Sequence, residues 1–250
     1  MISHTYLAHS LSVLRTRLTD PARSIPHGPR SEINPFITIS RETGAGATSL
    51  GQHLVPLLNQ EVEVGNGGWV YLGRDLLKNA LLHHQLPEQL ADYLPEDRIS
   101  ETKAFIGELL GLHPSLWQLE EKISEAILQL AHVGHVVFAG RAAHLITHGL
   151  PAGLHVRLIA SLPTRIARMA TVLNCSEEEA LAHIEQSELR RRHYVRAHFD
   201  QDIDDPHQYD LIVNSDRLTP AAVARIVVTA LHERLKAQSE HPAELAFVSD

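Results

Sequence analysis

The fold of this chain is decided by the stretch Phe36-Ile37-Thr38-Ile39-Ser40-Arg41-Glu42-Thr43-Gly44-Ala45-Gly46-Ala47-Thr48-Ser49-Leu50. A short β-branched apolar run is followed by a glycine-bearing turn and then by leucines at helical spacing. This order predicts a strand, a phosphate-binding loop and a helix. Such a turn directs backbone N–H groups and the positive end of the helix dipole at one point, so it suits an anion.

The turn supplies the candidate cofactor-binding residues, which are Thr43, Gly44, Ala45, Gly46, Ala47, Thr48 and Ser49. The two glycines would let the backbone approach a ligand closely, because they carry no side chain. Thr48 or Ser49 could offer a hydroxyl oxygen to a metal ion, and these two residues are the candidate metal ligands.

The P-loop pattern G-x-x-x-x-G-K-[ST] is matched only in part. When Gly46 is placed at the second glycine, Arg41 stands at the first glycine and Ala47 at the lysine. On spacing alone, an ordinary strand-to-helix turn that binds no phosphate is the alternative interpretation.

Bulk properties exclude several classes of protein. With 250 residues, 44% hydrophobic residues and 21% charged residues, the composition is that of a globular protein. The net charge of -8 argues against a general nucleic-acid binder. The single cysteine, Cys175, allows no intrachain disulfide, and no apolar run approaches the about 20 residues of a membrane span. We therefore expect a cytoplasmic protein without nucleic-acid or membrane partners.

Strand patterns alternate with helix patterns along most of the chain. The predicted strands are 36–39, 69–72, 136–139, 154–160 and 211–213. This alternation predicts an α/β fold with a parallel sheet, helices on both faces and ligands at the carboxyl ends of the strands. The predicted divisions are an accessory helix and linker at 1–34, a core domain at 35–236 with a helical excursion at 83–115, and a tail at 237–250.

Arginines gather late in an acidic chain: Arg165, Arg168, Arg190, Arg191, Arg192 and Arg196. Arginine forks match phosphate oxygens, and phosphoryl transfer needs positive charge around the transferred group. The alternative interpretation is a solvated helix face that compensates the glutamates of 177–188. Among the 18 histidines, His144 and His148 share a helix face, but no complete set of metal ligands accompanies them. Surface or half-buried histidines are the favoured interpretation.

Five blocks occur in a telling order: Ile39-Ser40-Arg41-Glu42-Thr43-Gly44-Ala45-Gly46, Val137-Phe138-Ala139-Gly140-Arg141-Ala142-Ala143, Arg165-Ile166-Ala167-Arg168-Met169, Glu188-Leu189-Arg190-Arg191 with Tyr194 and Arg196, and Tyr209-Asp210-Leu211-Ile212-Val213-Asn214-Ser215. Together, from about Pro35 to Leu235, they resemble the cytidylate kinase-like family, a branch of the P-loop nucleoside monophosphate kinases.

The resemblance implies a three-layer P-loop fold and transfer of the γ-phosphoryl group of ATP to a nucleoside monophosphate such as CMP, with Mg²⁺. It implies that residues 43–49 hold the donor phosphates and that residues 83–115 close over the acceptor. A lid at 186–206 would bring positive charge to the transferred group and exclude water. The implied catalytic residues are Arg41, Arg190, Arg191 and Arg196. The implied acceptor-binding residues are Arg74, Asp75, Arg141 and Arg165.

The sequence departs from the pattern of cytidylate kinases at three positions. Ala47 stands at the P-loop lysine, Gly73 at the aspartate after the second strand, and Glu188 at the lid aspartate. Arg41 or a lid arginine is a candidate substitute for the missing lysine. Two functions therefore stay open, a working kinase and a nucleotide-binding sensor or interaction protein that has lost the chemistry. The acceptor, the oligomeric state (a homodimer among the options) and the role of the N-terminal helix also stay open.

Overall fold

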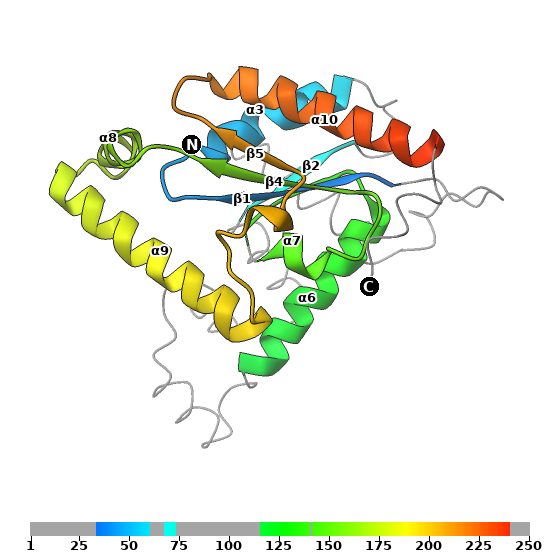
Figure 1. Cartoon of the computed structure of the whole chain (residues 1–250), viewed down its shortest axis with the longest axis horizontal. Helices are drawn as coiled ribbons and strands as arrows, with labels where there is room; N and C mark the ends of the chain where they lie inside the picture. Colours follow the sequence, from blue (N-terminus) through cyan, green and yellow to red (C-terminus); the bar gives the residue numbers. More distant parts are fainter. Residues whose placement is uncertain (1–33, 61–67, 74–115, 141, 241–250) are drawn as a thin grey trace.

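The structure is a computed structural model that describes residues 34–60, 68–73, 116–140 and 142–240 (Figure 1). Within these ranges one sheet is formed by β1 (Phe36–Arg41), β2 (Val70–Leu72), β3 (Val136–Ala139), β4 (Gly153–Ile159) and β5 (Leu211–Asn214). The strand order is β2-β3-β1-β4-β5, and every neighbouring pair is parallel. The carboxyl ends of all five strands therefore lie along one edge, as predicted.

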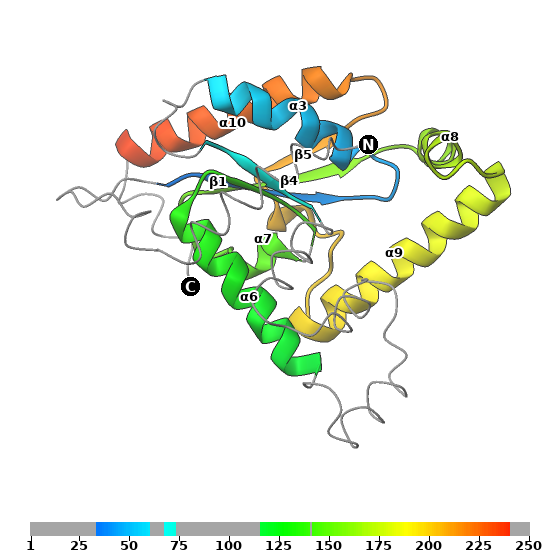
Figure 2. The same ribbon diagram turned by 180° about the vertical axis from the view of Figure 1, so that it is seen from behind.

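Helices cover both faces of the sheet. The first face carries α3 (Ala47–Gln60) and α10 (Pro220–Glu240), and the opposite face carries α6 (Leu116–Val133) and α7 (Ala143–Ile146) (Figures 1 and 2). Two further helices, α8 (Leu162–Leu173) and α9 (Glu177–Phe199), form an arm that begins at the carboxyl end of β4. A short 3-10 helix at Pro206–Gln208 leads into β5.

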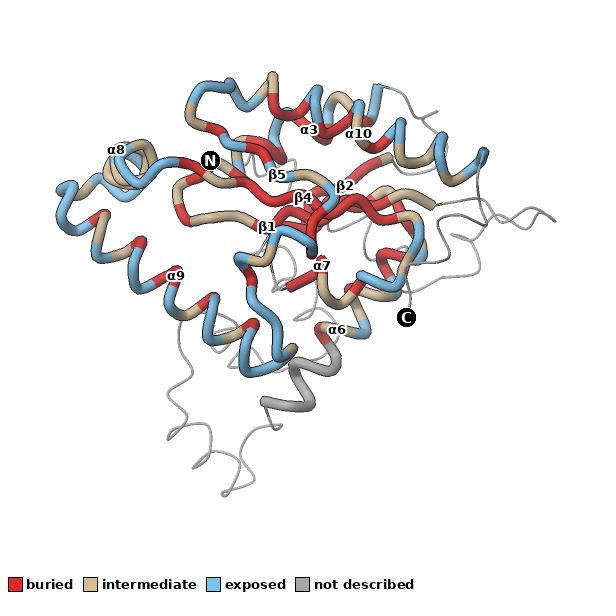
Figure 3. Tube along the Cα trace, in the orientation of Figure 1, coloured by how far each residue is buried: buried red, intermediate tan, exposed pale blue. Residues whose placement is uncertain are grey.

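Strand β1 is central, and its side chains alternate between two cores. Ile37 and Ile39 pack with the buried leucines of α3 and with the α10 face, whereas Phe36 packs with Phe138 and the α6 face. All these side chains are almost completely buried, and Figure 3 shows the sheet as the most buried part of the molecule. The apolar run at the start of β1 thus fixes the strand in the middle of three layers.

Local signals explain where the arm helices begin and end. The Ser176 hydroxyl accepts the N–H of Glu179 at 3.2 Å, and the Glu179 carboxylate accepts the N–H of Ser176 at 2.9 Å, so a capping box starts α9. Asn174 and Asp200 end α8 and α9 in the left-handed conformation. Helix α9 ends at Phe199.

Some predicted segments can be compared with the structure and others cannot. Residues 1–33 of the predicted accessory helix and linker, and the whole predicted excursion at 83–115, lie outside the described residues. Helix α10 continues to Glu240, beyond residue 236 where the predicted core domain ends. Among the helices that the structure describes, none is both long and apolar enough to cross a membrane.

Candidate active site

The glycine turn, residues 42–46, joins β1 to α3. Gly44 and Gly46 have φ values of 86° and 99°, which belong to the left-handed region that favours glycine. The N–H of Ala45 donates to Glu42 O at 3.1 Å, and the N–H of Leu50 donates to Gly46 O at 2.9 Å, which starts the ladder of α3. The N–H groups of 47–49 therefore lie in the first turn, where a helix offers no acceptor, and they suit an anion.

The two glycines serve different purposes. A Cβ on Gly44 would lie 2.8 Å from the carbonyl oxygen of Arg165, so a glycine is needed for α8 to approach the turn. A Cβ on Gly46 would have no heavy atom within 4 Å, so this glycine borders open space. The structure thus gives the turn one packed side and one accessible side, which a phosphate group would fit.

The lysine position of the P-loop pattern belongs to the core. Ala47 is 8% exposed and packs in the same hydrophobic cluster as the buried leucines of α3. Thr48 is exposed and Ser49 is half-buried at the start of the same helix. Positive charge for an anion at this turn must therefore come from residues outside α3.

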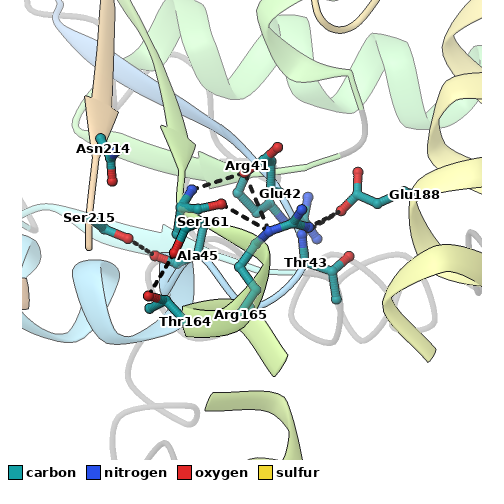
Figure 4. A network of polar contacts seen from close by, with 12 residues as sticks. Arg41, Glu42, Thr43, Ala45, Ser161, Thr164, Arg165, Glu188, Asn214 and Ser215 are labelled. Atoms are coloured by element: carbon teal, nitrogen blue, oxygen red, sulfur yellow. Dashed lines mark hydrogen bonds and ion pairs between the residues drawn. The ribbon is translucent and has the colours of Figure 1, made fainter. Parts of the chain in front are cut away.

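Helix α8 supplies two arginines to the turn. Arg165 Nε donates to Ala160 O at 3.1 Å, and the Arg165 guanidinium lies 3.5 Å from Glu42 Oε2 and 3.6 Å from Glu188 Oε1 (Figure 4). Its side chain is only 11% exposed. Arg168 Nη1 lies 3.4 Å from both Gly44 O and Ala45 O, so it reaches the carbonyl side of the turn.

Helix α9 contributes a buried ion pair one helical turn apart. Arg191 Nη1 donates to Arg41 O at 2.9 Å and to both oxygens of Glu188 at 3.1 Å, and Arg191 Nη2 donates to Thr43 Oγ1 at 3.0 Å. Glu188 Oε1 accepts the backbone N–H of Thr43 at 2.6 Å. Burial opposes the charged form of Glu188, but the Arg191 charge and the Thr43 hydrogen bonds hold its pKa below the usual range.

Glu42 fixes the relative position of the turn and α8. Its backbone N–H donates to Leu158 O at 2.9 Å, and its Oε2 atom accepts the N–H of Ala160 at 2.9 Å. The same carboxylate faces Arg165. Glu42 therefore ties the end of β4 to the end of β1 and orients the arginine above the turn.

The structure brings some of the sequence-predicted site residues together and separates others. Arg165 and Arg191 meet at the turn, whereas Arg41 contributes its carbonyl oxygen there. Arg190 Nε donates to Gln186 O within α9, and Arg196 pairs with Asp200 at the exposed end of that helix, 3.4 Å apart. Arg74, Asp75 and Arg141 lie outside the described residues.

The sequence patterns do not predict a second polar cluster, which lies on the face of the sheet that α7 covers. Arg157 of β4 is 4% exposed, and its Nη1 atom donates to Ser40 Oγ at 3.1 Å and to Tyr209 OH at 3.3 Å. Its other nitrogen pairs with Asp204, which also accepts a hydrogen bond from Arg192 Nε at 3.0 Å. An arginine inside the apolar run Leu154–Ala160 was the available signal.

The two buried histidines, His144 and His155, each have a polar partner. His144 Nε2 lies 3.3 Å from Tyr209 OH, and His155 Nδ1 lies 2.8 Å from Thr38 Oγ1. Burial lowers the pKa of His144 and of His155 to about 3, so both are neutral near pH 7. Among the described residues, no three His, Cys, Asp or Glu side chains are grouped as metal ligands.

Comparison with known proteins places this geometry in a family. Residues 36–217 match the model of the cytidylate kinase-like family. The chain is 29% identical to a cytidylate kinase of Methanothrix thermoacetophila over 196 residues, which cover 78% of this chain and 97% of that protein. It is 31% identical to a cytidylate kinase of Pyrococcus horikoshii over 120 residues, which cover 48% of this chain and 60% of that protein.

A solved structure shares the fold. An uncharacterized protein from Eubacterium ventriosum superposes with a TM-score of 0.53 at 16% identity, covering 79% of this chain and 98% of that one. The parallel sheet with helices on both faces, together with the family match, is that of an α/β P-loop kinase fold. The chain therefore belongs to the cytidylate kinase-like family.

Proposed function

We propose that this protein is a nucleotide-binding phosphotransferase that transfers the γ-phosphoryl group of ATP to a nucleoside monophosphate such as CMP. The observation that carries the proposal is the convergence of Arg165 and Arg191 on the glycine turn. A turn whose own lysine position is the buried Ala47 is thereby given two guanidinium groups from other helices. Family membership supports the reaction class.

On the donor side, the backbone of 43–49 binds the phosphates. The N–H groups in the first turn of α3 and the helix dipole attract their negative charge, and Gly46 leaves open space in front of the turn. The hydroxyl of Thr48 or Ser49 would hold Mg²⁺, which when bound neutralises charge on the donor phosphate oxygens.

Transfer requires positive charge around the moving phosphoryl group. Arg165 is fixed by Glu42 and Ala160 O, so its charge is oriented before a ligand binds. Arg191 comes from α9, which we propose to be part of a lid over 186–206 that also carries Arg190 and Arg196. Closure of that lid excludes water, which would otherwise accept the phosphoryl group.

On the acceptor side, we propose Arg74, Asp75 and Arg141 as monophosphate-binding residues. In the sequence one glycine separates Arg74 and Asp75 from β2, and one glycine separates Arg141 from β3. Both strands run parallel to β1, so their carboxyl ends share an edge with the glycine turn. Ligands of open parallel sheets bind at that edge.

The decisive experiment is an ADP-release assay with ATP and Mg²⁺ against CMP, dCMP, UMP, AMP, GMP and dTMP. A reaction without an acceptor is the control, because it measures simple ATP hydrolysis. Turnover that depends on one acceptor is the expected result and identifies the substrate. Absence of acceptor-dependent turnover with every monophosphate would contradict the proposed reaction.

The second candidate is a nucleotide-binding sensor or interaction protein that has lost the chemistry. The burial of Ala47 in the core favours it, since no lysine reaches the phosphates from α3. The variant Ala47→Lys separates the candidates. A degraded enzyme should gain turnover from the restored lysine, whereas an enzyme that uses arginines in its place should gain little or lose activity.

A further inference from the structure

The carboxylate of Glu188 contacts the start of the glycine turn, at Thr43, together with two arginines. Its Oε1 atom accepts the N–H of Thr43 at 2.6 Å, and both of its oxygens lie 3.1 Å from Arg191 Nη1. Arg165 Nη1 is 3.6 Å from the same Oε1 atom. A backbone N–H group and two guanidinium groups are the donors that proteins use for phosphoryl oxygens. Here the carboxylate of Glu188 contacts these donors in place of a ligand.

The carboxylate does not satisfy all of these donors. Arg165 Nη1 is buried and has no hydrogen-bond partner, because its distance to Glu188 exceeds that of a hydrogen bond. Buried donors are normally paired, so an unpaired one calls for an explanation. A phosphoryl group has three terminal oxygens and could bond Thr43, Arg191 and Arg165 together, which the two oxygens of one carboxylate do not achieve here.

Glu188 lies on α9, which is part of the proposed lid, so displacement of its carboxylate is linked to movement of the lid. Glu188 and Arg191 are three residues apart and lie on the same face of the helix. An incoming anion attracts Arg191 but repels the carboxylate beside it, so binding must move Glu188 while Arg191 stays near. The contact therefore opposes the binding of a phosphoryl group through charge as well as through occupied volume.

We propose that Glu188 is an internal anion that occupies the phosphoryl position of the glycine turn, and that a phosphate-bearing ligand binds by displacing it. This proposal rests on the proposed function. In it, the autoinhibitory contact of Glu188 regulates the binding of phosphate-bearing ligands at the turn. It sets the ligand concentration at which the turn is filled, because each binding event must first separate Glu188 from Thr43 and Arg165.

The test measures affinity for AMP-PNP with Mg²⁺, and for inorganic tripolyphosphate, by calorimetry on the full chain. The variant Glu188→Gln keeps the shape of the side chain and its acceptor oxygen but removes the charge. We expect it to bind both ligands at least fivefold more tightly than the wild type. The matched control is Glu185→Gln, which removes an exposed charge from the same helix and should change affinity less than twofold.

Two results would overturn the inference in different ways. If the wild type binds AMP-PNP and the folded Glu188→Gln variant binds it equally or more weakly, Glu188 is not a competitor, although the proposed nucleotide site stands. If neither the wild type nor any variant binds either ligand, the proposed function fails and the inference falls with it.

A second variant guards against misfolding of the first. Glu188→Asp keeps the charge but shortens the side chain by one methylene, which withdraws the carboxylate from the Thr43 N–H. We expect at least twofold tighter binding of tripolyphosphate than in the wild type. Circular dichroism melting of each variant identifies those that keep the native fold, and equal or weaker binding by a folded Glu188→Asp protein contradicts the proposal.

Discussion

Arg168 and Ser215 are joined by two hydrogen bonds, from Arg168 Nη1 to Ser215 Oγ at 2.9 Å and from Arg168 Nη2 to Ser215 O at 2.8 Å. The Ser215 hydroxyl in turn donates to Ala45 O at 2.8 Å. The end of β5, helix α8 and the carbonyl side of the glycine turn are therefore held as one unit. This arrangement leaves the N–H groups at the start of α3 free to face the opposite side.

Removing the Arg168 guanidinium should loosen this unit. We expect Arg168→Leu to lower the free energy of unfolding by about 1–3 kcal/mol, because a charged group loses several partly buried hydrogen bonds. Urea unfolding followed by circular dichroism measures the change. Arg225→Leu is the matched control, since Arg225 is exposed on α10 and should cost less than about 0.5 kcal/mol. Equal losses in the two variants would contradict the arrangement.

The two glycines of the turn should respond differently to alanine. Gly44→Ala places a Cβ 2.8 Å from the Arg165 carbonyl oxygen and also strains a left-handed backbone, so we expect it to cost about 2–4 kcal/mol. Gly46→Ala carries only the backbone strain, about 1–2 kcal/mol. The new methyl group borders the space proposed for phosphates. We therefore expect the affinity for AMP-PNP to fall by more than the loss of folding stability alone would explain.

Denaturant unfolding and calorimetry check both expectations for the glycines. Gly149→Ala serves as the control, because a Cβ there meets no atom within 4 Å and the backbone is not in the left-handed region. A Gly46→Ala protein that is less stable than Gly44→Ala would show that the approach of α8 to the turn is looser than described.

Stability should fall as the pH is lowered from 7.5 to 5. The pKa of His144 and of His155 is lowered to about 3 in the folded protein, against about 6.5 in an unfolded chain. Below about pH 6.5 the unfolded chain binds more protons than the native one, so unfolding is favoured by up to about 1.4 kcal/mol per pH unit for each histidine. The full contribution is present above about pH 7.

Urea unfolding at several pH values between 5 and 7.5 measures this slope. His155→Gln is expected to reduce it, because one of the two titrating groups is lost. His193→Gln, at an exposed position of α9, should leave the slope unchanged. A flat profile in the wild type would mean that the two buried histidines take up protons without unfolding.

Much of the fold follows from short sequence signals. The apolar runs at 136–139 and 211–213 are strands, as predicted, because such runs depend on neighbours in the chain. The strand ends were less accurate: β1 continues through Ser40 and Arg41, since pairing with β4 on one side extends it beyond its apolar residues.

The contacts of the site were harder to predict. Charge alone points to Arg165 and Arg191. Their long-range contacts, Arg165 with Glu42 and Arg191 with Arg41 O, join parts of the chain more than a hundred residues apart and depend on how α8 and α9 fold back. Arg191 also pairs with Glu188 on its own helix, but this pair is buried, unlike the solvated helix face of the alternative interpretation. Charge patterns alone do not distinguish these uses of one arginine.

Arg157 and Arg192 share one carboxylate, that of Asp204, and this sharing limits the free energy needed to move α9. Arg157 is buried in β4, whereas Arg192 on α9 is 56% exposed and Asp204 is 42% exposed. If α9 moved alone within the proposed lid, Arg192 would leave Asp204, but the buried guanidinium of Arg157 would keep its counter-ion. The motion then breaks only a solvated ion pair at this point, worth about 0–1 kcal/mol. In such a motion Asp204 would release α9 and stay paired with Arg157 of β4.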